Sequence, residues 1–403
     1  MEFQPIKFDW VIVRLGGEIG IKGDWTRRFY ERRLIRNIRN TLEYHEIPHQ
    51  KIVHKYGRIY IKTESAVKAS HALSKIFGVS SISPAVSAAS QLRHIMTKSL
   101  ELAEKVLQEG SSFAVRCHRV GVHPYKSMDV NREIGRQILT TLEGRNVRVD
   151  LKKPDRVIGI EVRDEDAYVF SETIKGVGGM PLGTQPKVVC LLSGGIDSPV
   201  ACWLMMKRGC PIIPVYFDNS PFTDEATTRK AIATAKKLFE WAIGFPQKLY
   251  IVPHGENLSV FQEKSPRRLT CILCKRMMYR IAERIADGEK AEGIVTGESI
   301  GEQASQTLQN LHVLNEAAQR YPVYRPLLGF DKTETEDLAR KIGTFEISIK
   351  KAKGCVAAPK KPATKARIEE VRIVEGKLNI EEMVKDSLAN SKIMDLSKTE
   401  ETV

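Results

Sequence analysis

The stretch Lys187-Val-Val-Cys-Leu-Leu-Ser-Gly-Gly-Ile-Asp-Ser198 decides the fold of the second half of the chain. Its apolar first part predicts a buried β-strand, and Pro199 directly after it is favourable in the first turn of a helix. The loop Ser193–Ser198 contains two glycines, which allow close backbone approach to a ligand, and two serine hydroxyls. A helix N-terminus behind it would offer unpaired N–H groups to an anion. We predict a phosphate-binding loop; an ordinary strand-to-helix turn is the alternative.

Asp197 is the unusual residue of this loop. The loop is not of the Walker A type, because no Gly-Lys-Ser or Gly-Lys-Thr follows its glycines. A carboxylate at a site for anions is unfavourable unless it binds a cation such as Mg²⁺ or takes part in the reaction. We therefore predict one of these two roles for Asp197.

The residues downstream of this loop predict strands that alternate with helices. The predicted strands are Ile212–Phe217, Lys248–Val252 and Gly293–Gly297, and the predicted helices are Pro199–Arg208, Thr223–Phe239 and Cys274–Ala286. Such alternation predicts a doubly wound parallel sheet with its ligand at the carboxyl ends of the strands. We assign this α/β domain to residues 187–375, and residues 376–403 to a loose polar tail with at most one helix.

The first half of the chain has an α+β pattern. In residues 1–65 we predict a strand at Asp9–Leu15, an arginine-rich helix around residues 30–42, and one half-buried strand over Lys51–Thr63. A second α+β unit is predicted for residues 66–175. The glycine-rich segment 176–186 has the composition of a linker.

The charge balance favours a polyanionic partner. The 403 residues include 63 Lys and Arg against 49 Asp and Glu, a formal net charge of +14. Residues 22–62 alone hold eleven basic residues against four acidic ones. Basic side chains that neutralise phosphates release counterions, which favours nucleic acid as the partner; a generic basic surface is the alternative.

Composition also bounds the location of the protein. No apolar run approaches the roughly 20 residues that a membrane helix needs, so no membrane insertion is expected. The first ten residues lack the apolar core of a signal peptide, and we expect a cytoplasmic protein. The seven cysteines are an odd set in a reducing compartment, so clustered cysteines predict metal binding or catalysis rather than disulfides.

Further motifs carry a resemblance to a known family. They are Lys175-Gly-Val-Gly-Gly-Met-Pro-Leu-Gly183, Lys275-Arg-Met-Met278, Thr296-Gly-Glu-Ser-Ile-Gly-Glu-Gln-Ala-Ser-Gln-Thr-Leu308 and Arg325-Pro-Leu-Leu-Gly-Phe-Asp-Lys332. With the Ser193–Ser198 loop, the chain resembles the tRNA 4-thiouridine synthetase (ThiI-type) family over residues 5–375, in the form without a rhodanese domain. The resemblance implies an N-terminal ferredoxin-like domain and a THUMP domain that together hold tRNA, followed by a PP-loop ATP pyrophosphatase domain.

The resemblance also assigns residues to ligands. Those implied to contact ATP are Leu191, Leu192, Ser193, Gly194, Gly195, Asp197, Ser198, Tyr216, Phe217, Lys275, Gly297 and Gln306. Those implied to contact RNA are Arg116, Arg119, Lys126, Arg132 and Lys332. The implied cofactors are ATP and Mg²⁺, and tRNA is the implied partner. A homodimer is compatible with the sequence.

The implied function is that of an ATP-dependent tRNA sulfurtransferase. ATP would adenylate the O4 of a uridine, at position 8 by resemblance, with release of pyrophosphate. Sulfur would then attack C4 and AMP would leave, giving 4-thiouridine. Another PP-loop tRNA thiolase, of the 2-thiouridine type, and a non-catalytic tRNA-binding protein are the alternatives. Asp197 disfavours the last of these, because a protein that only binds RNA has no need of it.

Three cysteines are candidates for handling the sulfur. Cys271-Ile-Leu-Cys274 directly precedes a predicted helix, where the helix dipole and Lys275 would favour thiolates. Cys355 lies in the segment 349–367, which holds six lysines, one arginine and no acid. Together with Asp197 we predict these three cysteines as catalytic.

Because the chain has no room for a rhodanese domain, sulfur is expected to come from sulfide or a sulfur-donor protein. We predict that Cys271, Cys274 and Cys355 bind an iron–sulfur cluster, of the 4Fe-4S type with three cysteine ligands and one open iron. A persulfide relay among the thiols is the second interpretation. A structural zinc site is the third.

Overall fold

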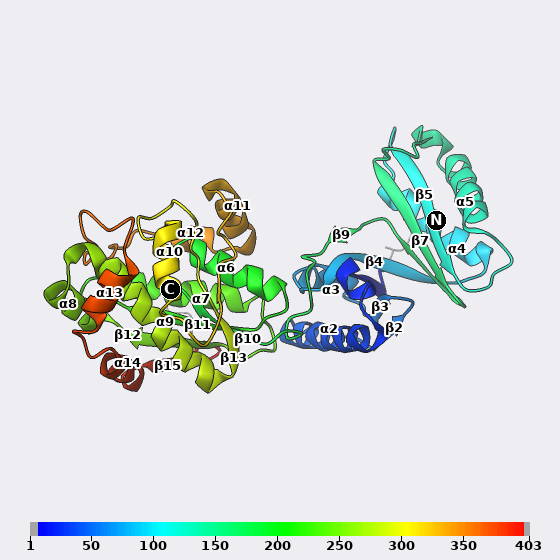
Figure 1. Ribbon diagram of the computed structural model, residues 1–403. Coiled ribbons are helices and arrows are strands. Elements are labelled where there is room, and N and C mark those ends of the chain that lie inside the picture. Colours follow the sequence, from blue (N-terminus) through cyan, green and yellow to red (C-terminus); the bar gives the residue numbers. More distant parts are fainter. Residues whose placement is uncertain (1–6, 399–403) are drawn as a thin grey trace. The chain divides into compact units, whose positions relative to one another are not determined.

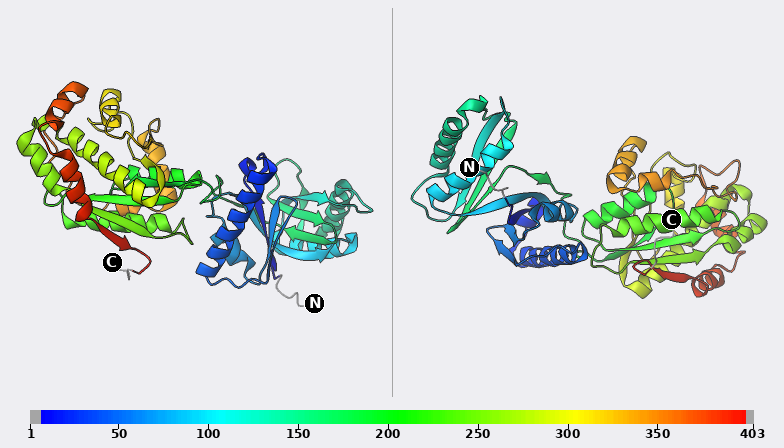
Figure 2. Two further views of the ribbon diagram at one scale, coloured as in Figure 1. Left: turned by 60° about the horizontal axis from the view of Figure 1, so that its bottom comes forward. Right: turned by 180° about the vertical axis from the view of Figure 1, so that it is seen from behind.

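The computed structural model describes residues 7–398, so residues 1–6 of the predicted first domain and 399–403 of the predicted tail lie outside it. The chain forms two compact units, Met1–Pro181 and Leu182–Val403, which we describe separately (Figures 1 and 2). The division falls within the predicted linker 176–186. Among the described residues, none of the helices combines the length and the apolar composition that crossing a bilayer requires.

The first unit is a mixed sheet covered by helices. Its elements are β1 Trp10–Leu15, α1 Gly17–Gly20, α2 Asp24–Tyr44, β2 Lys51–Lys55, β3 Arg58–Lys62, α3 Ala66–Leu73, β4 Val79–Ala89, α4 Leu92–Val106, β5 Ser112–Val120, α5 Ser127–Thr141, β6 Arg148–Val149, β7 Arg156–Arg163, β8 Asp166–Phe170 and β9 Ile174–Lys175. The strand order is β2-β3-β1-β4-β8-β7-β5-β6, and β9 pairs with β4. The α+β class predicted for this half is confirmed.

Strand β4 is common to both halves of this sheet. Its first part pairs with β1 and β9, whereas Val86–Ala89 pairs with β8. One apolar core packs α2 and α3 on β1 and β3, and a second packs α4 and α5 on β5, β7 and β8. The boundary that we predicted after residue 65 thus falls immediately before α3, whose buried residues Ala66, Ala69 and Leu73 belong to the first of these cores.

The predicted single strand over Lys51–Thr63 is instead a hairpin. Strands β2 and β3 pair antiparallel from Lys51 opposite Lys62 to Lys55 opposite Arg58. Tyr56 and Gly57 form the turn, with φ of 52° and 68°. Two consecutive residues with positive φ are typical of a type I′ hairpin turn, which Tyr-Gly signals less clearly than Asn-Gly does.

The second unit is an α/β domain. Its elements are β10 Lys187–Leu191, α6 Asp197–Lys207, β11 Ile212–Asp218, α7 Glu225–Phe239, β12 Lys248–Pro253, α8 Gly255–Lys264, α9 Thr270–Glu289, β13 Ala291–Val295, α10 Leu308–Asn315, β14 Val323–Tyr324, α11 Lys332–Ile342, α12 Phe345–Ser348, α13 Ile368–Glu375, α14 Ile380–Ala389 and β15 Lys392–Asp395. The order of the strands is β14-β13-β10-β11-β12-β15, and all pairs except β12–β15 are parallel.

Helices cover both faces of this sheet. Val189 packs in the core that contains α9, whereas the next residue, Cys190, lies against Cys202 of α6. Successive residues of a strand point to opposite faces, so α6 and α9 lie on opposite sides of β10. The predicted doubly wound parallel sheet is therefore confirmed.

The predicted loose tail is structured over much of its length. Helix α14 packs on α9 through Val384, which is 1% exposed, and the half-buried Ile380 and Leu388. Strand β15 then adds an antiparallel sixth strand beside β12. Over the described residues 376–398 the tail contains one helix, within the predicted limit. The prediction of a loose tail is wrong, because the apolar spacing of a short charged segment suffices to bury one face of α14.

Candidate functional site

The phosphate-binding loop lies between β10 and α6, as predicted. Its serines fix its shape: the Ser193 N–H donates to Ser198 Oγ at 2.9 Å, and the two Oγ atoms are 3.0 Å apart. The Gly195 N–H donates to Ser193 Oγ at 3.2 Å. Helix α12 also contacts the loop: Ser348 Oγ donates to the Gly195 carbonyl at 3.1 Å.

Two glycines are required by close packing around the loop. A Cβ at Gly297 would lie 2.6 Å from the Ser198 backbone nitrogen, and a Cβ at Gly194 would lie 2.8 Å from Lys230 Cβ. A larger residue at Gly297 would push the segment after β13 away from the start of α6, and one at Gly194 would push the loop away from α7. Gly297 thus lets the carboxyl ends of β10 and β13 approach each other, where a doubly wound sheet binds its ligand.

Asp197 faces a lysine from a distant part of the sequence. Lys332, the first residue of α11, donates to Asp197 Oδ1 at 2.9 Å and to Glu302 Oε2 at 3.3 Å. Burial alone would lower the pKa of Lys332, but hydrogen bonds and charge from both carboxylates raise it. The residue that we predicted as an RNA contact therefore lies at the phosphate-binding loop. The other oxygen of Glu302, Oε1, is buried and has no hydrogen-bond partner among residues 7–398.

Lys275, predicted to contact ATP, is held by a buried carboxylate. Glu298, which is 4% exposed, accepts from Lys275 Nζ at 2.9 Å and from Arg325 Nε at 2.7 Å. Tyr279 and Thr296 donate to its Oε2 at 2.7 and 3.1 Å. Burial by itself would raise the pKa of Glu298, but the two cations and their hydrogen bonds lower it to about 2. Glu298 thus fixes the direction of Lys275.

The remaining predicted ATP contacts gather at the same edge of the sheet. Leu191 ends β10 and Leu192 directly follows it, and Tyr216 and Phe217 lie near the end of the neighbouring strand β11. Gln306 is 7% exposed, in a turn closed by the Gly301 N–H on its carbonyl at 3.1 Å. Its side-chain Oε1 is buried and has no hydrogen-bond partner.

The three cysteines predicted to handle sulfur come together. Cys274 and Cys355 pack in one small apolar cluster, and Cys271 lies near enough to both to influence them electrostatically. Two hydrogen bonds hold the loop of Cys355 in place. The Val356 N–H donates to the Phe222 carbonyl at 3.0 Å, and the Gln262 side-chain amide donates to the Ala357 carbonyl at 3.1 Å. We call Cys271, Cys274 and Cys355 the three neighbouring thiols.

The prediction that the helix dipole makes these cysteines thiolates is wrong for this structure. Helix α9 begins at Thr270, so both cysteines of the Cys-x-x-Cys segment lie inside its first turns rather than before it. Burial raises the pKa of Cys271 and of Cys274, and Lys275 offsets this only in part. Within residues 7–398, no three His, Cys, Asp or Glu side chains are gathered closely enough to ligate a single metal ion.

Cys274 also contacts a buried histidine. His254 Nε2 is 3.4 Å from Cys274 Sγ, and Asn257 Nδ2 is 3.1 Å from His254 Nδ1. An amide that donates to Nδ1 leaves the proton on Nε2, facing the sulfur. Burial lowers the pKa of His254 to about 3, so the imidazole is neutral.

The four predicted RNA contacts of the first unit lie on strand β5 and at the start of helix α5. Arg116 and Arg119 lie on β5, Lys126 directly precedes α5, and Arg132 lies in the first half of α5, which packs on β5. Arg116, Lys126 and Arg132 are exposed and form no ion pair in the part of the chain that the structure describes. Arg119 donates to the Gly121 carbonyl at 2.7 Å.

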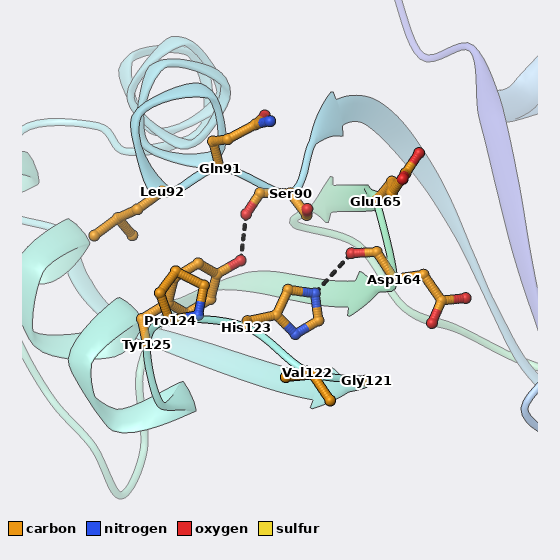
Figure 3. A pocket seen from close by; sticks show the side chains of 10 residues that line it. All are labelled: Ser90, Gln91, Leu92, Gly121, Val122, His123, Pro124, Tyr125, Asp164 and Glu165. Atoms are coloured by element: carbon orange, nitrogen blue, oxygen red, sulfur yellow. Dashed lines mark hydrogen bonds between the residues drawn. The ribbon is translucent and has the colours of Figure 1, made fainter.

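A hollow of about 860 Å³ lies beside these residues (Figure 3). Two hydrogen bonds fix its wall. Tyr125 donates to the Ser90 carbonyl, and His123 Nε2 lies 2.7 Å from the Asp164 carbonyl oxygen. The imidazole of His123 stacks on Tyr125 with ring centroids 5.5 Å apart. The loop 121–125 therefore has a defined shape.

Comparison with known proteins agrees with this division of the chain. Family models match residues 10–83 (ThiI ferredoxin-like domain), 89–172 (THUMP domain) and 183–380 (thiamine biosynthesis protein ThiI). A probable tRNA sulfurtransferase from Methanosarcina mazei is 44% identical over 392 residues, 96% of this chain and 95% of its own length. The chain belongs to the ThiI tRNA sulfurtransferase family. A relative of the same description from Thermoanaerobacter pseudethanolicus is 40% identical over 92% of this chain and 96% of its own length.

A solved structure of a 4-thiouridine synthetase is similar over nearly the whole chain. The crystal structure of a 4-thiouridine synthetase–RNA complex with bound ATP superimposes with a TM-score of 0.86 at 35% identity, over 96% of this chain and 99% of that one. The ferredoxin-like, THUMP and PP-loop organisation that the sequence predicts is thereby confirmed.

Sequence reasoning missed three site residues: Glu298, Glu302 and His254. The two glutamates lie inside the quoted motif Thr296–Leu308, and acidic residues in a segment expected to face a triphosphate were a usable signal. His254 gave no such signal, because its contact with Cys274 joins residues twenty positions apart on two elements.

Proposed function

We propose that this chain is an ATP-dependent tRNA sulfurtransferase that converts a uridine of tRNA, at position 8 by family resemblance, into 4-thiouridine. ATP adenylates the uracil O4 and pyrophosphate leaves. Sulfur then attacks C4, and AMP departs with the former O4. The similarity to a 4-thiouridine synthetase with bound ATP and RNA supports this proposal, whereas 2-thiolation has no such support.

The observation that carries the proposal is the cation–carboxylate arrangement at the Ser193–Ser198 loop. Lys332 bridges Asp197 and Glu302 and lies where the phosphates of ATP would enter. An ammonium at this place neutralises negative charge that develops on the phosphates as pyrophosphate leaves. A protein that only binds RNA would gain nothing from this arrangement.

Asp197 and Glu302 fit a Mg²⁺ ion that accompanies ATP. Both are oxygen ligands, and Glu302 Oε1 is buried without a partner, as expected of an oxygen that awaits a cation. The ion would supply charge neutralisation on the phosphates. In the proposed reaction, Lys332 then moves its contacts from these carboxylates to the triphosphate.

The three neighbouring thiols fit an iron–sulfur cluster that supplies an open iron for sulfide. Cys274 and Cys355 pack in one cluster, Cys271 lies within electrostatic reach of both, and the segment 349–367 around Cys355 adds only positive charge. His254 faces Cys274 Sγ with its Nε2 and would donate a hydrogen bond to a thiolate there. A persulfide relay is the second candidate, since the Cys271 and Cys355 thiols are partly accessible.

Nucleoside analysis of tRNA tests the reaction. An unmodified tRNA transcript incubated anaerobically with the protein, ATP and sulfide should yield 4-thiouridine, together with tRNA-dependent release of pyrophosphate. Appearance of 2-thiouridine would favour the other thiolase class. Tight tRNA binding without pyrophosphate release, by protein that contains iron and labile sulfide, would contradict the proposal.

A further inference from the structure

The segment that carries Cys355 has no regular structure of its own. Between the end of α12 at Ser348 and the start of α13 at Ile368, the chain forms neither helix nor strand. We call residues 349–355, Ile-Lys-Lys-Ala-Lys-Gly-Cys, the cysteine strap. Its three lysines are exposed, and the repulsion among them opposes a compact arrangement of the strap. Contacts with other elements therefore fix the place of Cys355.

Helix α7 holds the start of the strap through a lysine. Lys230 Nζ donates to the Ser348 carbonyl at 2.6 Å and to the Lys350 carbonyl at 3.0 Å. Carbonyls at the C-terminus of a helix lack partners within that helix, and a lysine side chain is a suitable donor to them. Within residues 7–398 the Lys230 ammonium forms no ion pair, so its charge is directed at these two carbonyls.

The N-terminal cap of α7 holds the middle of the strap. Asp224 Oδ1 accepts from the Thr227 N–H at 3.0 Å, as in an ordinary N-cap, whereas Asp224 Oδ2 accepts from the Lys353 N–H at 3.0 Å. The hydrogen bond from Lys353 is the largest cause of the lowered pKa of the Asp224 carboxyl. Thr227 Oγ1 also lies 3.1 Å from the Lys353 carbonyl oxygen. Two residues further along, Cys355 enters the cluster that contains Cys274.

The same turn of α7 supports the phosphate-binding loop. A Cβ at Gly194 would lie 2.8 Å from Lys230 Cβ and 3.5 Å from the Thr227 carbonyl oxygen, so the loop packs directly on the helix. At the start of the strap, Ser348 Oγ donates to the Gly195 carbonyl. One turn of one helix thus contacts both the phosphate-binding loop and the cysteine strap.

We propose that Lys230 and Asp224 are positioning residues for sulfur transfer, which hold Cys355 at a fixed place relative to the phosphate-binding loop. The inference rests on the proposed function, in which sulfur from the three neighbouring thiols attacks a uracil adenylated at this loop. A displacement of about 1 Å can slow a reaction about a hundredfold. Neither residue touches ATP, tRNA or sulfur in this role. Release of the strap would spare adenylation and impair the step that follows it.

The variant Lys230→Met tests the proposal through the two steps of the reaction. Methionine keeps an aliphatic side chain against Gly194 and removes the ammonium. In a single turnover with tRNA, ATP and sulfide, tRNA-dependent pyrophosphate release should keep its wild-type rate, whereas 4-thiouridine should form at least about tenfold more slowly. An adenylate that waits for sulfur is open to water, which attacks C4, expels AMP and restores uridine. Pyrophosphate is then released without thiolated product.

Alkylation of Cys355 gives a second readout that needs no catalysis. In full-length, reduced, metal-free protein, iodoacetamide should modify Cys355 of Lys230→Met at least about tenfold faster than in wild type, because two hydrogen bonds from a charged donor are lost. The partly exposed Cys117 of the first unit is the internal reference and should react at an unchanged rate. Asp224→Asn should also expose Cys355, since its remaining oxygen can cap α7 while its amide faces the Lys353 N–H.

Arg229→Met is the matched control. It removes a cation from the next position of α7, where Arg229 pairs with Glu225 at 2.9 Å and both side chains are exposed, and it should change neither readout. An equal loss of pyrophosphate release and of 4-thiouridine in Lys230→Met would overturn the inference, because Lys230 would then act at the ATP site or through folding. Unchanged alkylation of Cys355 in both Lys230→Met and Asp224→Asn would overturn it as well. A wild-type protein that forms no 4-thiouridine would contradict the proposed function, and alkylation would still decide the inference.

Discussion

Replacing Glu298 by glutamine should destabilise the second unit strongly at neutral pH. The carboxylate accepts from Lys275, Arg325, Tyr279 and Thr296. The amide keeps the shape but not the charge. It leaves Arg325, whose side chain is 8% exposed, without its counter-charge. Breaking one half of a buried ion pair costs about 3–5 kcal/mol.

The lowered pKa of Glu298 gives a second value for the folding free energy that its charge contributes. A pKa held at about 2 instead of 4.5 corresponds to about 3 kcal/mol of folding free energy. Because the folded-state pKa is the lower one, this contribution is complete above pH 4.5 and is lost as the pH falls toward 2. About 2 kcal/mol of it should be gone at pH 3. The difference between wild type and Glu298→Gln should therefore be about 3 kcal/mol at pH 7 and clearly smaller at pH 3.

Urea denaturation of wild type and Glu298→Gln, followed by circular dichroism, measures the difference in free energy of unfolding at pH 7 and at pH 3. Hydrogen exchange of peptides from α9, which carries Lys275 and Tyr279, assigns the loss to the second unit. Glu381→Gln is the matched control: its 3.0 Å pair with Arg284 is exposed and should contribute less than about 1 kcal/mol. Adding Arg325→Met to Glu298→Gln should recover part of the loss. Equal stability of Glu298→Gln and wild type at pH 7 would refute the reasoning.

Three further predictions concern the reaction. Asp197→Asn should preserve folding and tRNA binding but abolish 4-thiouridine, because Lys332 and the cation lose their carboxylate; near-wild-type product would exclude the assigned role. Deletion of residues 1–181 should remove most tRNA affinity and leave ATP binding, measured by calorimetry; unchanged tRNA affinity would contradict the division of labour. Alanine at any of the three neighbouring thiols should eliminate iron, labile sulfide and activity from anaerobically purified protein, whereas Cys202→Ala should eliminate none. Active protein without iron would decide against the cluster, and one zinc per chain would favour the structural site.

The alternation of strands and helices in the second half was predictable, because the parallel strands are short apolar runs and helices such as α7 and α9 have a periodic apolar face. The Ser193–Ser198 loop was predictable for the same local reason: strand, glycines and helix follow one another without interruption. Its placement at the carboxyl edge of the sheet follows from topology alone.

The contacts that complete the site were not predictable in this way. Lys332 meets Asp197 across 135 positions, and no local pattern encodes that pairing. The start of α9 was predicted four residues late, because a 3₁₀ turn at Arg267–Leu269 leads into the helix and the N-cap residue Leu269 offers no side-chain cap. The protonated state of Cys274 follows from burial, which depends on the loop of Cys355 packed over it.

Strand β4 makes the two N-terminal domains inseparable in practice. The family models end at residue 83 and resume at residue 89, yet the strand runs without interruption from Val79 to Ala89. A chain cut in that interval would separate Ser81 and Ile82 of β4 from their partner strand β9, and the open hydrogen-bonding edges that this leaves recruit other chains into aggregates. Expression of the first domain alone should therefore give material more prone to aggregation than the whole unit. The two modules that sequence comparison separates are therefore joined in the structure by one continuous strand.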